Sequence, residues 1–167
     1  MAIDALTALL FLPFAIPIGI WVAWNDMKFM KIPNKAVYAL FGVFVVVGLV
    51  ALPFADYLWR WPQAFVVLVI GFILNQVRAM GAGDAKFLAA MAPFIDPGDA
   101  LNLYIILAAV LLGAFVTHRI GRATPAIRRM TPDWDSWTRA KFPMGLALGS
   151  GLIFYLVLGV IFGERPV

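Results

Sequence analysis

The chain of 167 residues has no cysteine and a single histidine. These absences exclude a disulfide framework and any cysteine-ligated zinc, haem or iron–sulfur site, so we expect no metal and no cofactor. Charged residues are also scarce, at 13%, whereas soluble domains average about a quarter. A hydrophobic fraction of 63% takes their place and predicts an integral membrane protein.

Six apolar stretches divide the sequence, and we expect each to form a helix. They cover residues 5–24, 36–54, 61–77, 85–95, 100–117 and 142–162. Because a membrane span needs about 17 to 25 residues, five stretches qualify and the fourth is too short alone. We therefore predict an all-α integral membrane protein, a six-helix transmembrane bundle with a short fourth helix, forming one domain over residues 1–167.

Basic residues indicate the orientation of this bundle. With the N-terminus outside, the inner loops hold eleven of the 13 Lys and Arg residues, and only Arg60 and Arg165 lie outside. The positive-inside rule favours this topology. The net charge of +4 then reflects topology and does not indicate nucleic-acid binding. The first six residues carry no basic residue, so the first stretch is predicted to be a mature helix and not a signal peptide.

Two aspartates fall at predicted inner ends of helices. Asp26 follows the first apolar stretch, and Asp84 follows Gly81-Ala82-Gly83. A carboxylate in or near a bilayer is costly, which makes each a candidate functional residue. The glycines permit unusual backbone conformations and close approach of a substrate chain. Asp84 is expected at the N-cap of the fourth helix, where the helix N-terminus favours the ionised carboxylate.

Each of these residues also has a simpler interpretation when taken alone. Asp84 can be only a helix cap, and Asp26 only a surface residue paired with Lys28 or Lys31. Lys86 can lower a carboxylate pKa, contact substrate, or extend to the lipid headgroups.

Several further residues have a structural interpretation when taken alone. Pro33 is suited to the start of the second helix, and Asn34 to a backbone hydrogen bond there. Gly145 and Gly149 form a small-xxx-small face on the last helix. Residues 118–141 are predicted to be a basic, turn-broken surface segment that can lie on anionic lipid, with Asp133 and Asp135 solvated.

Taken together, these segments resemble the type IV prepilin peptidases, membrane aspartic proteases of the GxGD class. In that family the first aspartate precedes a basic stretch ending in Ile-Pro-Asn, as Asp26 precedes Ile32-Pro33-Asn34. The second aspartate lies in Gly-x-Gly-Asp-x-Lys, which matches residues 81–86. A weaker resemblance is Pro143-Met144-Gly145, where Met144 replaces the usual aromatic residue.

The resemblance implies a membrane aspartic endopeptidase at the cytoplasmic face of a bacterial or archaeal inner membrane. Its substrate would be a prepilin with a basic leader and an apolar helix. The lipid bilayer would surround both the enzyme and the helix of the substrate. The implied catalytic residues are Asp26 and Asp84, and the implied site-shaping or substrate-binding residues are Gly81, Gly83, Lys86, Asn34, Pro33, Pro143 and Gly145. The sequence makes no prediction of oligomeric state.

Larger members of the family carry a region with paired cysteines that is associated with methylation of the new N-terminus of the product. Because this chain has no cysteine, it resembles the short, protease-only form, often linked to Flp-type tight-adherence pili, and methylation is not expected. Two neighbouring carboxyls would share one proton. We expect Asp84 to be the carboxylate that activates water and Asp26 the acid, with exchange of these roles during the cycle left open.

Two other functional classes compete with this interpretation. Presenilin-like proteases share Gly-x-Gly-Asp but have about nine helices, and their first aspartate lies in a Tyr-Asp pair inside a helix, whereas Asp26 follows Asn25 and is expected in a loop-flanked position. A non-catalytic membrane subunit or a small ion- or proton-coupled transporter would use the same two aspartates. Transporter carboxylates usually lie near the membrane midplane, so the boundary positions of Asp26 and Asp84 favour proteolysis.

Overall fold

The structure, a computed structural model, describes residues 1–164, and its regular elements over that range are all helices. Its α-helices are α1 (Ala5–Phe29), α2 (Asn34–Ala51), α3 (Phe54–Gln76), α4 (Ala82–Met91), α5 (Ala100–Ala123), α6 (Pro125–Met130) and α7 (Met144–Phe162). Three short 3₁₀ turns are η1 (Ala92–Phe94), η2 (Pro97–Asp99) and η3 (Asp135–Trp137).

Five of these helical stretches are long and apolar enough to cross a membrane. They are α1, α2, α3, residues Pro97–Ala123 and α7. The helix α4 has 10 residues and covers about 15 Å at 1.5 Å per residue. The all-helical class, the five spans and the short fourth helix therefore agree with the sequence-based prediction.

The predicted count of six helices is wrong for residues 1–164, which contain a seventh α-helix, α6. We expected Thr124-Pro125 to form a turn in the surface segment of residues 118–141. Instead, Pro125 occupies the first turn of α6 and Thr124 precedes it, because proline is well suited to a helix start, where its missing N–H is not needed. The helix ends after six residues at Met130, shortly before Pro132.

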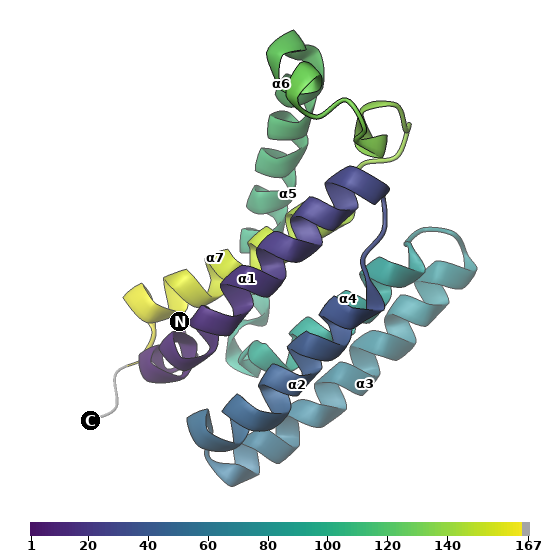
Figure 1. The fold of residues 1–167 in the computed structure, drawn as a ribbon. Coiled ribbons are helices and arrows are strands. Elements are labelled where there is room, and N and C mark those ends of the chain that lie inside the picture. The colour runs from purple at the N-terminus through teal and green to yellow at the C-terminus, as the bar shows by residue number, and fades with distance from the viewer. Residues whose placement is uncertain (165–167) are drawn as a thin grey trace.

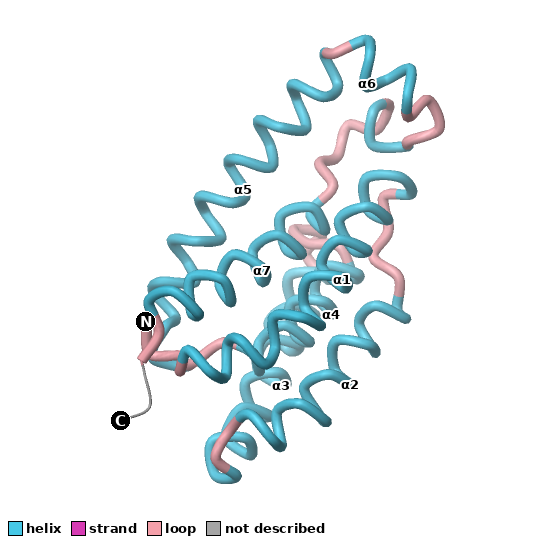
Figure 2. The backbone as a smooth tube through the Cα atoms, turned by 60° about the vertical axis from the view of Figure 1, so that its left-hand side comes forward, coloured by secondary structure: helices cyan, strands magenta, loops and turns pink. Residues whose placement is uncertain are grey.

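The helices form two packed groups that meet along α1, as Figure 1 shows. In one group, α7 packs along α1, and α5 packs on α7. In the other, α4 packs against α3 and α2, while α2 also contacts α1. In Figure 2, α5 diverges from α7 toward the end that carries α6. The short α4 thus lies inside the bundle, in contact with the longer helices α2, α3 and α7.

An aromatic cluster joins the two groups. The rings of Phe11 and Phe94 meet edge to face at 4.7 Å between centroids, and Phe44 lies 5.7 Å from Phe94 and 5.2 Å from Tyr57. All four side chains are buried. Such pairs contribute about 0.5–1.5 kcal/mol each beyond their buried area, so α1, α2, α3 and η1 are held together at one level.

A polar network closes the bundle end where α4 finishes. Asp99, with 0% exposure, accepts hydrogen bonds from the backbone N–H groups of Ala2 and Ile3 and from Tyr155 Oη. The nearly buried Arg60 pairs with Asp96 at 2.7 Å. Because the partners come from the N-terminal segment, α3 and α7, the network fixes the α4–α5 connection to all three.

Helices α1 and α7 pack with their backbones in direct contact. A Cβ added at Gly19 would lie 2.8 Å from the Gly149 carbonyl oxygen, and one added at Gly149 would clash with the Gly19 backbone. The two backbones therefore touch directly, which small residues permit at membrane helix interfaces.

We expect Gly149→Ala to destabilise the protein by about 1–3 kcal/mol, because an added methyl overpacks a backbone contact. The matched control is Gly42→Ala, since a Cβ at Gly42 meets nothing within 4 Å. Unfolding in mixed micelles under increasing denaturing detergent measures both. Equal midpoints for the two variants would contradict the packing argument.

Candidate active site

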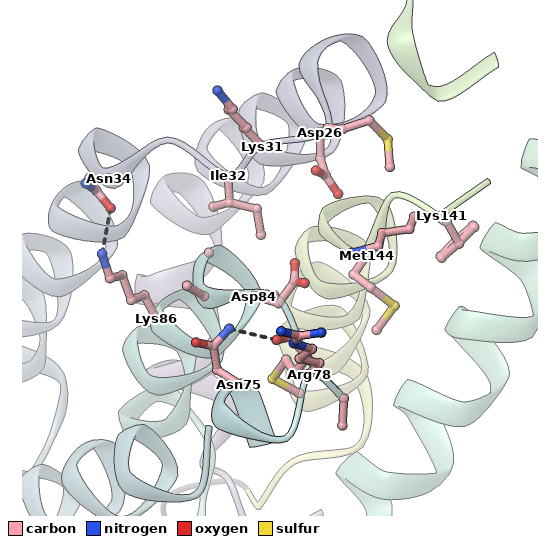
Figure 3. Close-up of a pocket in the computed structure, with 17 residues that line it drawn as sticks. Asp26, Lys31, Ile32, Asn34, Asn75, Arg78, Asp84, Lys86, Lys141 and Met144 are labelled. Carbon is pink, nitrogen blue, oxygen red and sulfur yellow. Dashed lines mark hydrogen bonds between the residues drawn. The ribbon is translucent and has the colours of Figure 1, made fainter. Parts of the chain in front are cut away.

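A cavity of about 800 Å³ opens at the end of the bundle opposite the Asp99 network. Its 17 lining residues come from four segments: the end of α1 with the α1–α2 loop, the α3–α4 loop, the start of α4, and the residues that lead into α7. Figure 3 shows the carboxyl groups of Asp26 and Asp84 directed into this cavity from opposite walls. The structure thus brings the two aspartates to one site.

Asp26 lies inside the last turn of α1 and is 5% exposed. The loop-flanked position expected for it is wrong, because α1 continues past the apolar stretch to Phe29. The backbone N–H of Gly145 donates a hydrogen bond of 2.6 Å to Asp26 Oδ2. Gly145 also leaves the space that this carboxyl occupies, since a Cβ there would lie 2.8 Å from the Asp26 Cβ.

Asp84 lies in the first turn of α4, two residues after the helix begins at Ala82. The N-cap is Gly81, so the expected N-cap position of Asp84 is wrong. The Asp84 carboxyl turns back over Gly81, where an added Cβ would lie 2.6 Å from Asp84 Oδ2. This is the position from which an N3 side chain faces the N-cap backbone N–H.

The glycines of the motif provide space and not unusual dihedral angles. Gly81 has φ −70°, and no glycine in residues 1–164 has a positive φ. Gly83 faces Ile32, and a Cβ at Gly83 would lie 3.4 Å from the Ile32 Cβ, an ordinary contact distance, so the need for space is evident at Gly81 only. The left-handed residues are instead Met30, with φ 53°, and Arg78, with φ 60°, and both line the cavity.

Two asparagines hold the loops that contain these left-handed residues. Asn25 Nδ2 donates to the Lys31 carbonyl oxygen at 2.7 Å, and Asn75 Nδ2 donates to the Met80 carbonyl oxygen at 2.9 Å. Neither asparagine, nor Arg78, was identified from the sequence. The available signal was an amide residue placed five or six positions before the carbonyl that it binds, which is too common to stand out.

The other predicted site residues lie around this cavity. Pro33 directly precedes α2, and Asn34 begins it. Asn34 does not bond the local backbone as expected, but its Oδ1 accepts from Lys86 Nζ at 3.4 Å. Figure 3 shows the Lys86 side chain directed toward Asn34 and away from Asp84. Pro143 precedes α7 and does not line the cavity.

Basic side chains surround the two carboxyls without neutralising them. Lys31, Arg78, Lys86 and Lys141 line the cavity. None forms an ion pair with an acidic side chain of residues 1–164. In the simpler interpretation of Asp26, this residue would pair with Lys28 or Lys31. Lys28 instead pairs at 2.9 Å with Asp133, which was expected to be solvated.

Burial dominates the electrostatics of Asp84. Desolvation raises the pKa of this carboxyl above its usual value, and the backbone N–H of Gly81 opposes the rise only in part. The pKa of Asp84 therefore lies above its usual value even though this residue stands in the first turn of a helix. Within residues 1–164, no group of three or more His, Cys, Asp or Glu side chains could hold a metal ion.

The raised pKa of Asp84 makes a prediction for stability against pH. Between the unfolded value of 3.8 and the raised folded pKa, the folded state binds more protons, so wild-type stability falls as the pH rises. Asp84→Asn removes this loss, and we expect the variant to gain stability over the wild type at pH 7 but not below pH 3.8. Unfolding midpoints measured at both pH values test this.

Asp133→Asn provides a control of opposite sign. Lys28 lowers the pKa of the exposed Asp133 carboxyl, so its small contribution is present at neutral pH and is lost as the pH falls. A pH-independent difference between Asp84→Asn and wild type would contradict the burial argument.

Comparison with known proteins gives one match. The model of the type IV leader peptidase family matches residues 13–118 of the chain. No curated protein and no solved structure matches it. The matched region contains both cavity aspartates, from the end of α1 and the start of α4, and reaches into α5. Since it covers more than half of the sequence, the chain belongs to the type IV leader peptidase family.

Proposed function

We propose that this protein is an aspartic endopeptidase that cleaves the leader from type IV prepilins, with Asp26 and Asp84 as its catalytic pair. The single observation that carries the proposal is that both carboxyls face one cavity, although they are borne by different helices. Family membership supplies the reaction class, and the cavity supplies the residues.

The chemistry follows from two carboxyls that face the same space. Their mutual repulsion and their burial disfavour double ionisation, so the pair holds one proton near neutral pH. The ionised carboxyl takes a proton from a water molecule, whose oxygen attacks the scissile carbonyl carbon. The protonated carboxyl gives its proton to the carbonyl oxygen, which forms a tetrahedral diol. The carboxyl that took the proton from water then delivers it to the leaving amine, while the other carboxyl takes a proton back from the diol as the new carbonyl forms. The two residues exchange their proton states over a cycle.

Gly145 acts as a positioning residue in this mechanism. Its N–H binds the Asp26 oxygen Oδ2 at 2.6 Å, which leaves Oδ1 available for water. Gly81 positions Asp84 in a similar way through backbone contact and lack of a side chain. We assign Gly83, Pro33 and Asn34 to the support of these two walls, Pro143 to the start of α7, and Lys86 to the wall shared with Asn34.

The topology we propose places the N-terminus outside and the cavity at the cytoplasmic face, in a single membrane domain of six core helices with α6 outside the bilayer. The four basic residues at the cavity argue against attraction of a basic leader by bulk charge. Lateral packing of the substrate's apolar helix would then provide much of the recognition. We propose a Flp-type prepilin as the substrate.

Asp26→Asn and Asp84→Asn should each reduce prepilin processing by at least about 100-fold, because each removes one half of an acid–base pair. Purified protein reconstituted with a Flp-type prepilin, followed by gel mobility and mass spectrometry of the product, measures this. Asp133→Asn is the control, since its exposed carboxyl lies outside the cavity lining. Wild-type processing by either dyad variant overturns the proposal, and a cation-dependent ion flux that needs both aspartates would support the transporter instead.

Gly145→Ala should reduce processing about tenfold or more without unfolding the protein. The added Cβ would lie 3.0 Å from Asp26 Oδ2 and must displace the carboxyl, and displacements of about 1 Å are costly to catalysis. We expect the effect in kcat more than in KM, with Gly42→Ala as the matched control. Unchanged kcat would contradict the positioning role of Gly145.

A further inference from the structure

A row of three cavities runs along α5, away from the aspartate site. The first, about 550 Å³, lies between α5 and α7 and is lined by apolar and small residues such as Ile106, Gly113 and Phe154. The second, about 370 Å³, shares Thr117, Leu146 and Ser150 with it. The third, about 400 Å³, shares Trp137 with the second. The shared lining residues make the three cavities neighbours in one path.

This path changes from apolar to polar along the direction of the membrane normal. The first cavity lies within the spanning parts of α5 and α7. The second is bordered by Trp24, Trp134 and Trp137, whose rings contact one another in sequence at 5.0 and 5.5 Å. Tryptophan favours the level of the lipid headgroups. The third cavity lies beyond the end of α5, beside α6.

The outer end of the path is positively charged and lacks a partner. Arg128 and Arg129 line the third cavity, and neither forms an ion pair with an acidic side chain of residues 1–164. The two nearby acids are already engaged, because Asp133 pairs with Lys28 and Asp135 with Arg139. The two guanidinium groups are therefore left for an anion from outside the chain.

The middle of the path contains an unsatisfied polar atom. His118 is 4% exposed and lines the second cavity, and its Nε2 has no hydrogen-bond partner. Its ring stacks on Trp137 at 5.3 Å, which fixes its orientation. Buried polar atoms are rarely left without a partner, so a ligand with a polar group at this level would satisfy Nε2.

We propose that this path binds one phospholipid with an anionic headgroup, from the leaflet at the aspartate end of the bundle. The acyl chains occupy the first two cavities, the ester region lies beside His118, and the phosphate lies between Arg128 and Arg129. The apolar lining, the unpartnered histidine and the two arginines without ion pairs follow one another along the path. The acyl chains, the ester region and the phosphate follow one another in the same order along such a lipid. The site does not depend on the chemistry of Asp26 and Asp84.

Native mass spectrometry of the full chain in detergent tests the site, with phosphatidylglycerol and phosphatidylcholine of equal chain length as probes. We expect wild type to retain one phosphatidylglycerol roughly tenfold more tightly than phosphatidylcholine. Arg128→Gln with Arg129→Gln should bring the two affinities together. Lys35→Gln with Arg78→Gln removes two positive charges away from the three cavities and should leave the preference unchanged.

Two further arms separate a lipid from other anions and from general charge effects. Ser150→Phe fills the boundary of the first two cavities and should weaken retention of both lipids severalfold. Millimolar glycerol 3-phosphate, which has no acyl chains, should not displace the lipid. Asp84→Asn should bind lipid as wild type does, because the lipid site does not use the two aspartates. A failure of the proteolytic proposal would therefore leave the result of the lipid test unchanged.

The proposal is overturned by an unchanged headgroup preference in the double arginine variant or by unchanged retention in Ser150→Phe. Competition by glycerol 3-phosphate overturns it in favour of a site for free phosphate. An equal loss of preference in the Lys35 and Arg78 control would show a general effect of charge and would also overturn it.

Discussion

The contact on which the aspartate site depends is the direct backbone packing of α1 on α7. Gly19 and Gly149 bring the two helices together without side chains between them. About one turn back along α7, Gly145 then meets Asp26 near the end of α1, close enough for a hydrogen bond of 2.6 Å. A wider separation of the helices would leave the Asp26 carboxyl buried without a donor, which is unfavourable. One small-residue interface therefore serves both packing and the geometry of a carboxyl.

The short length of α4 shapes the other half of the site. Its 10 residues cover only about half of a hydrocarbon core of roughly 30 Å. The space that a full-length helix would fill is partly occupied by the α3–α4 loop and partly left as the cavity. The Asp99 network holds the far end of the α4 region, through η2 and the Arg60–Asp96 pair. Asp84 thus lies in the first turn of α4, beside the cavity, while the Asp99 network anchors the region after the last turn of the helix.

Composition and run length predicted the all-helical class, the five long spans and the short α4, because burial of apolar side chains in lipid requires those lengths. The same signal missed the ends of helices. The first apolar stretch ends at residue 24, but the backbone hydrogen bonding of α1 continues to Phe29 and includes Asp26 in the helix. It also missed α6, where Pro125 starts a helix in place of breaking the chain. Local polarity does not reveal where backbone bonding ends.

The two aspartate segments were found from the sequence, but the geometry around them was not. The contact of Gly145 with Asp26 joins residues 119 positions apart, and no local pattern encodes such a contact. The same holds for the Lys28–Asp133 pair and for the Lys86–Asn34 bond. The motif glycines were interpreted through unusual backbone conformations and close approach of a substrate chain. No glycine in residues 1–164 has a positive φ, whereas a Cβ at Gly81 would lie 2.6 Å from Asp84 Oδ2.

The long separation between Asp26 and Gly145 also has a consequence for biosynthesis. Helix α1 is synthesised before α7, so the carboxyl of Asp26 has no Gly145 N–H to bind until the 119 positions that separate the two residues have been made. Until then, the end of α1 is better solvated at the membrane surface than buried. The cavity is therefore completed only when α7 has inserted, and a partly synthesised chain cannot hold both carboxyls in their final places.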